Sequence, residues 1–550
     1  MMHDLVVTGG PVATMDESLP QADWVAITQG VVTAVGVGEP PAAREVLNAD
    51  GGLILAGFND AHCHTMWFGL SLAEVDCKSQ GTLDAVYDAL VERAREVGPG
   101  AWVLATGYNQ EAFDGHYPDI QILDRLLPEN PLFLRHTSGH ACIVNTAALK
   151  IAGLVGDTAP DIPGGVIVKD AHGTPTGVLE ERAQSVIQEL LLPKSQSEMV
   201  AALDRATAVY ATEGITSFTE TGIAGGWIGH SPLEFSAYQT AREAGVLRAR
   251  AQLMPVSDVL HPIGGHTEDP HRRGLDTGIR TGVGDDYLSL GGIKIFLDGS
   301  MLAWTGAMSE PFAAGPADNY GYFQAEISDL RETMLEACAS GWSIGAHAIG
   351  DRAVALALDT FDEAISRYGA PTIPHRIEHG GVVTDEQARR AAQLGVAIVT
   401  QPGFMPELGV QMSEAMGPER TPLIHRHQGL LDAGVMVAGS SDRPVATGRP
   451  LSIIQSMVER LAADGFVVGP QERVSIQDAL WSYTLGSAQT TGMAHCKGQL
   501  RPGFLGDVVV LSGDPLRCPT DEIAGLSVVH TIVGGHFTLK DGEVHQLPHR

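Results

Sequence analysis

The chain reads Leu-Ile-Leu-Ala-Gly-Phe-Asn-Asp-Ala-His-Cys-His over residues 53–64. The first six residues are apolar and have the length of a buried β-strand, so we predict a strand over Leu53–Phe58. Side chains two residues apart in a strand point to the same side. His62 and His64 can therefore bind one metal ion together at the end of this strand. An HxH pattern also occurs by chance on polar turns, so the assignment depends on further ligands elsewhere in the chain.

Seven more short apolar runs bounded by glycine or proline follow, and amphipathic stretches lie between many of them. Eight strands, most of them followed by a helix, predict an α/β fold of the TIM (β/α)8 barrel type, whose active sites lie at the carboxyl ends of the strands. The seven predicted strands are Ile215–Glu220, Leu247–Met254, Gly292–Leu297, Trp342–His347, Pro374–His379, Val396–Gln401 and Val435–Ser440.

The two ends of the chain carry a different pattern from the middle. Short apolar runs alternate with Gly-rich turns over the first and the last 55 residues, which is typical of β-strands and hairpins. We predict one small composite β-sandwich from residues 1–55 and 495–550, and the barrel over 56–494. The gap between the first two barrel strands is much longer than one helix needs. We interpret residues 66–197 as an insertion that covers the active site.

Residues with metal-binding side chains end several of the later strands. His347 and His379 each end a predicted strand, Asp442 closes the eighth, and Lys294 lies inside a very apolar one. Imidazole and carboxylate suit zinc, manganese or iron. A buried lysine amine loses its proton readily and could take up CO₂ to form a carbamate that bridges two ions. Each residue alone could also be a hydrogen-bonded core histidine or a lysine that reaches outward to solvent.

Composition excludes several classes of partner. The chain has 35 Lys and Arg against 66 Asp and Glu, a net charge of −31. Such a surface repels phosphate backbones and anionic lipid, so we expect neither nucleic acid nor membrane partners. No signal peptide and no long apolar run is visible in the sequence. Six scattered cysteines indicate reduced thiols, hence a cytoplasmic protein. A homodimer is the default expectation for an oligomer.

Taken together, these motifs resemble the amidohydrolase superfamily and, within it, the branch of YtcJ-like proteins and N-substituted formamide deformylases. The similarity runs over essentially the whole chain. The segments that carry it are Gly57–His64, Ser138–His140, Lys294–Ser300, Ala346–Ala353, His375–His379, Ser441–Pro444 and Gly498–Val510.

The resemblance implies a metal-dependent amidohydrolase that acts on a small-molecule amide, an N-substituted formamide or an N-acyl amine. It implies one or two divalent ions per chain, with zinc as the expected metal, and an N6-carboxylysine at Lys294 as the bridge. We expect metal-activated hydroxide to attack the carbonyl while Asp442 shuttles the proton to the leaving amine. The implied metal ligands are His62, His64, Lys294, His347, His379 and Asp442.

Other residues are candidates for contacts with the substrate. His140, in the insertion, could donate to the substrate carbonyl, or could be a solvated loop histidine. Trp67 and Trp304 follow predicted strands and could line an apolar pocket. Asp351 and Arg352 could pair to fix the loop after the fifth strand, although Asp351 is better explained as the N-cap of the next helix.

Alternatives to amide hydrolysis remain open on the sequence. The same metal cage could hydrolyse esters, carbamates or cyclic imides, or could deaminate. In a different class, the chain could be a metal-binding structural protein without turnover, although the filled ligand set argues against this reading.

Overall fold

The computed structural model describes residues 2–136, 141–155, 162, 165–226, 228–266, 268 and 272–548. The chain forms two compact units. One consists of Met1–Thr65 and Leu203–Arg550, and the other of Met66–Ala202. Helices α1 (Thr65–Ser71) and α6 (Gln196–Thr212) carry the chain from one unit to the other. None of the described helices is both long and apolar enough to cross a membrane.

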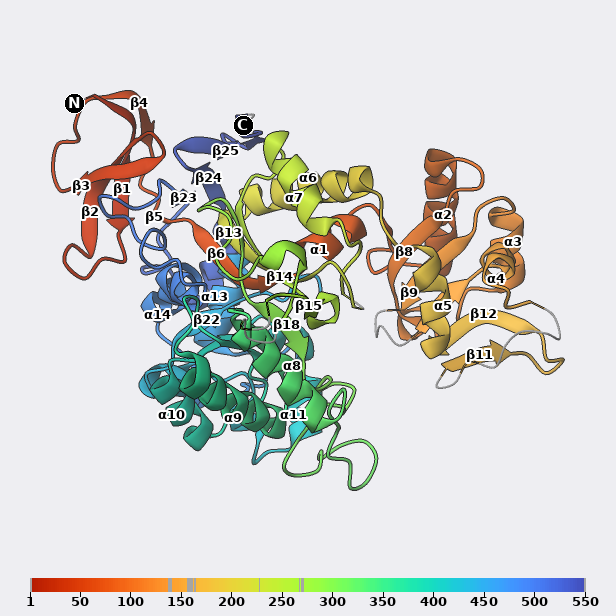
Figure 1. Ribbon diagram of the computed structural model, residues 1–550. Coiled ribbons are helices and arrows are strands. Elements are labelled where there is room, and N and C mark those ends of the chain that lie inside the picture. Colours follow the sequence, from red (N-terminus) through yellow and green to blue (C-terminus); the bar gives the residue numbers. More distant parts are fainter. Residues whose placement is uncertain are drawn as a thin grey trace. The chain divides into compact units, whose positions relative to one another are not determined.

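Strands from both ends of the chain form one nine-stranded sheet in the first unit (Figure 1). Its order is β26-β25-β24-β23-β5-β1-β2-β3, and β4 pairs in parallel with β1 between His3 and Thr8. The strands are β1 (His3–Ala13), β2 (Gln21–Thr28), β3 (Val31–Gly36), β4 (Ala43–Asn48), β5 (Ile54–Ala56), β23 (Val508–Leu511), β24 (Val528–Val533), β25 (His536–Lys540) and β26 (Glu543–Val544). The two ends of the chain therefore share a sheet, whereas a separate sandwich domain stays a prediction.

The strand predicted over Leu53–Phe58 is in fact two strands. β5 belongs to the nine-stranded sheet, whereas β6 (Phe58–Cys63) pairs in parallel with β13 (Ile215–Ile223). The chain changes sheets at Gly57, where a Cβ atom would lie 2.1 Å from Thr216 Oγ1. The apolar run crosses this break because both of its halves are buried.

Parallel strands form two further sheets in the first unit, with orders β17-β14-β13-β6 and β18-β19-β20-β21-β22. Every predicted barrel strand overlaps one of them; β17 was not predicted. The α/β class is thus confirmed, and closure into a barrel stays a prediction. The remaining bounds are β14 (Arg250–Pro255), β17 (Leu288–Leu290), β18 (Ile293–Phe296), β19 (Ile344–Ala348), β20 (Arg376–His379), β21 (Ala397–Thr400) and β22 (Val437–Gly439).

Contacts at both edges link these two parallel sheets. A parallel bridge joins Val256, just after β14, to Lys294 on β18. At the other edge, the backbone N–H of Asp442 donates to the His62 carbonyl oxygen over 2.8 Å, and His64 N–H donates to Arg443 O over 2.8 Å. The carboxyl ends of β6 and β22 therefore lie side by side, with their histidines and aspartate at the same place.

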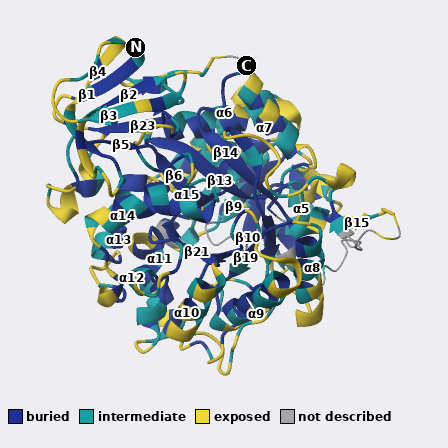
Figure 2. Ribbon diagram, turned by 60° about the vertical axis from the view of Figure 1, so that its left-hand side comes forward, coloured by how far each residue is buried: buried dark blue, intermediate teal, exposed yellow. Residues whose placement is uncertain are grey.

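Helices alternate with these strands and bury their apolar stripes. In α9, residues three and four apart such as Val354, Ala357 and Phe361 are buried, while other faces are exposed (Figure 2). A capping box between Thr384 and Gln387 starts α10. The helices of this unit are α7 (Glu234–Glu243), α8 (Ile327–Ala339), α9 (Asp351–Tyr368), α10 (Asp385–Leu394), α11 (Phe404–Met416), α12 (Gln428–Asp432), α13 (Pro450–Glu459), α14 (Ile476–Trp481) and α15 (Ser487–Thr490).

The second unit, Met66–Ala202, has a six-stranded sheet of its own with order β11-β12-β10-β9-β8-β7. The insertion was predicted over residues 66–197, and its role as a cover of the active site stays a prediction. The elements are β7 (Val75–Asp76), α2 (Leu83–Val97), β8 (Val103–Tyr108), α3 (Ile120–Leu126), β9 (Leu132–His136), β10 (Ala141–Val144), α4 (Thr146–Ile151), β11 (Gly165–Lys169), β12 (Pro175–Glu181) and α5 (Arg182–Leu190).

Buried neutral histidines make the fold sensitive to acid. Burial lowers the pKa of His375 to about 4, so between pH 6.5 and 4 the unfolded chain binds a proton that the folded chain does not. Stability therefore falls as the pH drops through this range, by about 2 kcal/mol at pH 5 for this residue. In His375→Phe, whose ring can still stack on Phe361, we expect a smaller drop in melting temperature between pH 7 and pH 5 than in the wild type. Equal drops in the two proteins would contradict this account.

Candidate metal centre

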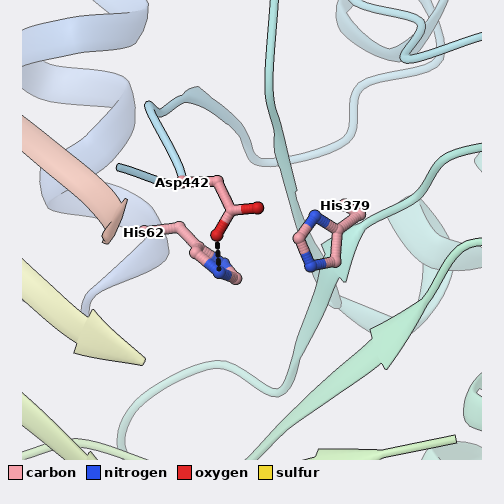
Figure 3. Close-up of side chains that lie close together, drawn as sticks. All are labelled: His62, His379 and Asp442. Atoms are coloured by element: carbon pink, nitrogen blue, oxygen red, sulfur yellow. Dashed lines mark ion pairs between the residues drawn. The ribbon is translucent and has the colours of Figure 1, made fainter. Parts of the chain in front are cut away.

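Three buried side chains converge at the carboxyl ends of the parallel strands. His62 comes from β6, His379 ends β20, and Asp442 follows β22. One ligand atom from each lies within 4.8 Å of the other two, and the three side chains face a common point (Figure 3). Strands far apart in the sequence thus bring together three of the predicted metal ligands.

The contacts of His62 leave a place for a cation. Its Nδ1 lies 2.6 Å from Glu378 Oε2, so this nitrogen carries the hydrogen and Nε2 carries a lone pair. That Nε2 is 3.2 Å from Asp442 Oδ1, yet neither buried atom makes a hydrogen bond. Two lone pairs that face each other at this distance repel unless a positive charge lies beside them. The residues present therefore fit a bound metal ion.

The carboxyl group of Asp442 is buried between two imidazoles. His64 Nε2 lies 3.1 Å from Asp442 Oδ1, and its Nδ1 lies 4.0 Å from Glu220 Oε1. An anionic oxygen between two imidazoles is a donor set suited to zinc.

An acceptor also fixes the ring of His379. Its Nδ1 lies 2.8 Å from Gln401 Oε1. The Gln401 amide cannot be flipped without breaking two hydrogen bonds, because its Nε2 donates to Ser440 Oγ over 3.0 Å and to Val399 O over 3.2 Å. The Nδ1 of His379 therefore carries the hydrogen, and Nε2 is left with the lone pair that a metal needs.

His347 and Lys294 lie next to this group. The His347 ring centroid is 4.6 Å from that of His379, and its Nδ1 lies 3.2 Å from Asp298 Oδ1. Asp298 is itself held by the backbone N–H groups of Ile349 and Gly350. Lys294 is buried, and burial lowers its pKa to about 8, although Glu378 and Asp442 oppose the shift. A fraction of its amine is thus unprotonated near neutral pH, as carbamate formation requires.

Two of the converging residues have strained backbones. His379 has a φ of 75° and Asp442 a φ of 54°, in the left-handed region that non-glycine residues seldom occupy. Such a conformation costs about 1–3 kcal/mol per residue and tends to occur at functional sites. With this backbone conformation, both side chains lie close to His62.

The residues that orient these rings were not predicted from the sequence. Glu378, Asp298 and Gln401 each accept from the Nδ1 of a different histidine. Glu378 also receives two hydrogen bonds from Arg376, at 2.8 and 2.9 Å. A signal was present, because each is a polar residue at or next to the end of a predicted buried strand.

The candidate substrate residues have varied surroundings. His140 lies outside the described residues. Within the second unit, Arg135 lies over the Trp67 ring at 5.7 Å. Trp304 has a φ of 54° and packs, partly buried, against a methionine-rich apolar cluster. Whether either tryptophan lines a substrate pocket stays a prediction.

Asp351 starts helix α9, as predicted, but it is not the N-cap. The N-cap is Gly350, and the Asp351 carboxylate instead accepts from the backbone N–H of Ser309 over 2.8 Å. Arg352 lies over the Phe323 ring at 5.2 Å. The expectation of an aspartate cap was wrong because a neighbouring loop supplies the carboxylate with a better partner.

Gln401→Leu should weaken metal binding. The substitution removes the acceptor that orients His379, and loss of such a partner costs about 10–100-fold in metal affinity. Zinc titration against a chelator of known affinity measures the effect. Gln252→Leu is the matched control, because Gln252 is also buried and its amide bonds to Thr491 O instead. Equal zinc affinity in the two variants would refute the orienting role.

Comparisons with known proteins identify the family of the chain. Residues 45–539 match the model of a family described as the amidohydrolase family. Among similar proteins, LONG AFTER FAR-RED 3 of Arabidopsis thaliana is 30% identical over 547 residues, 97% of this chain and 91% of that protein. YtcJ of Bacillus subtilis strain 168 is 29% identical over 542 residues, with 96% and 98% covered. The N-substituted formamide deformylase of Arthrobacter pascens is 29% identical over 551 residues, with 97% and 98% covered.

Solved structures show the same fold. The crystal structure of an uncharacterized metal-dependent hydrolase from Pyrococcus horikoshii OT3 aligns with a TM-score of 0.74 at 23% identity. The alignment covers 94% of this chain and 99% of that one.

Proposed function

The chain belongs to the amidohydrolase family, and we propose that it is a metal-dependent hydrolase. The bond that it cleaves in this proposal is the C–N bond of an N-substituted formamide or of another N-acyl amine. The observation that carries the metal dependence is the unbonded pair of acceptor atoms, His62 Nε2 and Asp442 Oδ1. The similarity to an N-substituted formamide deformylase supports the choice of bond. The proposed partner is accordingly a small-molecule amide.

The residues that would hold an ion are His62, His379 and Asp442, with His64 and His347 beside them. A divalent ion, zinc first among the candidates, supplies a Lewis acid that polarises the carbonyl and lowers the pKa of water. Lys294 is placed near Glu378 and Asp442 for a carbamate, and N6-carboxylysine at this position would allow a second ion.

Asp442 moves the proton in this proposal. As a buried carboxylate beside the imidazoles of His62 and His64, it takes a proton from the attacking water and delivers it to the nitrogen of the leaving amine. Glu378, Gln401 and Asp298 keep three imidazoles in the tautomer that leaves Nε2 free. Their contacts are made before substrate arrives, so the rings need no rearrangement during the reaction.

Two measurements on the same protein test this proposal: its metal content and its activity on a panel of substrates. Protein purified without chelator is subjected to elemental analysis and assayed on a panel of N-formyl amines, N-acetyl amines and matched esters. We expect one or two ions per chain, deformylation as the fastest reaction, loss of activity with a chelator and recovery with zinc or manganese. Faster turnover of the esters would overturn the choice of bond. No metal, and no gain on adding it, would overturn the hydrolase mechanism.

A further inference from the structure

Asp60 is a buried carboxylate that the reaction described above does not use. It lies on β6, two residues before His62, and is 1% exposed. Its Oδ1 accepts from the backbone N–H of Ser441 over 3.1 Å and from that of His62 over 3.3 Å. Its Oδ2 accepts from Ser441 Oγ over 2.5 Å, a length typical of a hydroxyl that donates to a carboxylate. Because Ser441 directly precedes Asp442, one side chain joins the backbone at two candidate metal ligands.

The other end of the turn that carries Asp442 is anchored as well. Ser441 Oγ, which donates to Asp60, also accepts from the backbone N–H of Arg443 over 3.0 Å. The buried guanidinium of Arg443 pairs with Glu213, directly after α6, with Nη2 2.9 Å from Oε1 and Nη1 2.7 Å from Oε2. Asp442 therefore stands between two residues whose side chains are held by carboxylates from other parts of the first unit.

Asp442 needs such support because its backbone is strained. Its φ of 54° lies in the left-handed region, which non-glycine residues seldom occupy unless surrounding contacts hold them there. In this conformation its Oδ1 lies 3.2 Å from His62 Nε2 and 3.1 Å from His64 Nε2. If the turn relaxed to a negative φ, the Cα–Cβ bond would point in another direction and the carboxylate would leave the two imidazoles. The contacts that hold the turn therefore also hold the candidate ligands together.

We propose that Asp60 is a positioning residue of the metal centre, which acts through Ser441 to keep Asp442 in its left-handed conformation before an ion binds. The carboxylate of Asp442 is then already in place when the ion arrives, so binding does not have to order the turn. Asp60 itself contacts neither the ion nor the substrate. The inference rests on the metal dependence in the proposed function and not on which bond is cleaved.

Hydrogen exchange in chelator-treated protein tests whether Asp60 holds the turn. The probe is the backbone N–H of Asp442, which donates to His62 O over 2.8 Å and not to Asp60. In Asp60→Leu the turn loses two hydrogen bonds to a carboxylate, so we expect this N–H to exchange about tenfold faster or more. Asp60→Asn keeps an oxygen for the two backbone N–H groups and should exchange at nearly the wild-type rate. An unchanged rate in Asp60→Leu would overturn the inference.

Titration with cobalt(II) alone tests whether the turn matters for the metal. Cobalt(II) binds to the same kinds of ligand as zinc, and its visible absorption reports how it is coordinated. In Asp60→Leu we expect the cobalt affinity to fall about 10–100-fold, the usual cost of losing a residue that supports a metal ligand, and the absorption spectrum to change. Asp60→Asn should restore most of the affinity and the wild-type spectrum. Wild-type affinity in Asp60→Leu would contradict the positioning role.

Asp124→Leu is the matched control. Asp124, in the second unit, accepts from the backbone N–H of Thr146 over 2.8 Å and from its Oγ1 over 2.6 Å, the same pair of bonds that Asp60 accepts from Ser441. This variant should change neither exchange at Asp442 nor the cobalt affinity, and equal effects of the two leucine variants would overturn the inference. If Asp60→Leu does not fold, Ser441→Ala, which removes only the hydroxyl, should show both changes at a smaller size. No change in Ser441→Ala would then overturn it.

The two measurements separate this inference from the proposed function. A wild-type protein that takes up no cobalt would refute metal-dependent hydrolysis, and exchange at Asp442 in the metal-free proteins would still decide whether Asp60 holds the turn. Faster exchange in Asp60→Leu without any loss of cobalt affinity would overturn the positioning role while the proposed function stands. Faster exchange together with weaker cobalt binding supports the role of Asp60, even if the enzyme hydrolyses no amide.

Discussion

Asp442→Asn should reduce turnover by about 10³-fold or more while most of the bound metal stays in place. The substitution keeps the shape and one oxygen of the side chain but removes the charge and the group that carries the proton. His62, His64 and His379 remain to hold the ion. Because the carboxylate lies 3.2 Å from His62 Nε2 and 3.1 Å from His64 Nε2, the amide can still fill the same space.

The measurement combines kcat on an N-formyl amine with elemental analysis of the same sample. Asp385→Asn makes the same chemical change at an exposed carboxylate that pairs with Arg426, and should leave kcat within about twofold. Near-normal activity in Asp442→Asn would remove Asp442 from the proton path. If the Asp442→Asn protein contained no metal, Asp442 would be needed mainly as a metal ligand and not as the proton carrier.

His62→Ala should have the opposite signature, because the ion itself is lost. His62 supplies a ligand nitrogen that points at Asp442 and is oriented by Glu378. Without it, two of the three converging ligands remain. Activity should fall to background, and added zinc should not raise the melting temperature of this variant, whereas we expect it to raise that of the wild type.

Metal content and melting curves with and without added zinc test this expectation. His375→Phe serves as the control, because it removes a buried histidine that directly precedes β20 and leaves the three ligands unchanged. Zinc bound by His62→Ala as tightly as by the wild type would disprove the metal role of His62. Taken with Asp442→Asn, the two variants distinguish the residue that moves protons from one that holds the ion.

Most of the strands that build the centre could be predicted from the sequence, because local patterns specify them. Buried parallel strands are short apolar runs, and a ligand at the end of such a run lies at the carboxyl edge with the others. His379 and Asp442 were assigned in this way, and the structure places both beside His62. The family was likewise predicted from the motifs and is confirmed by the match over residues 45–539.

Contacts between strands that are distant in sequence could not be predicted. The hydrogen bond from His62 to Glu378 joins residues 316 positions apart, and it depends on how β6 and β20 are placed. The break at Gly57 was hidden because both sides of it are equally apolar. The left-handed backbone of His379 and Asp442 was hidden as well, because Asp and His adopt a positive φ more often than most residues but still only seldom, so residue type alone does not predict it.

The sharing of one sheet by both ends of the chain has a consequence for biosynthesis. β5 needs β23 as its neighbour, yet Val508 is made roughly 450 residues after Ala56. At about 5–20 residues per second, the ribosome takes about 20–90 seconds to deliver the missing strand. During that time one edge of β5 has no partner, and an open edge is a site for pairing with another chain. A protein truncated before β23 should therefore aggregate. For the full-length protein, expression at low temperature should improve the yield of folded protein, because fewer incomplete chains are then present at one time to pair with each other.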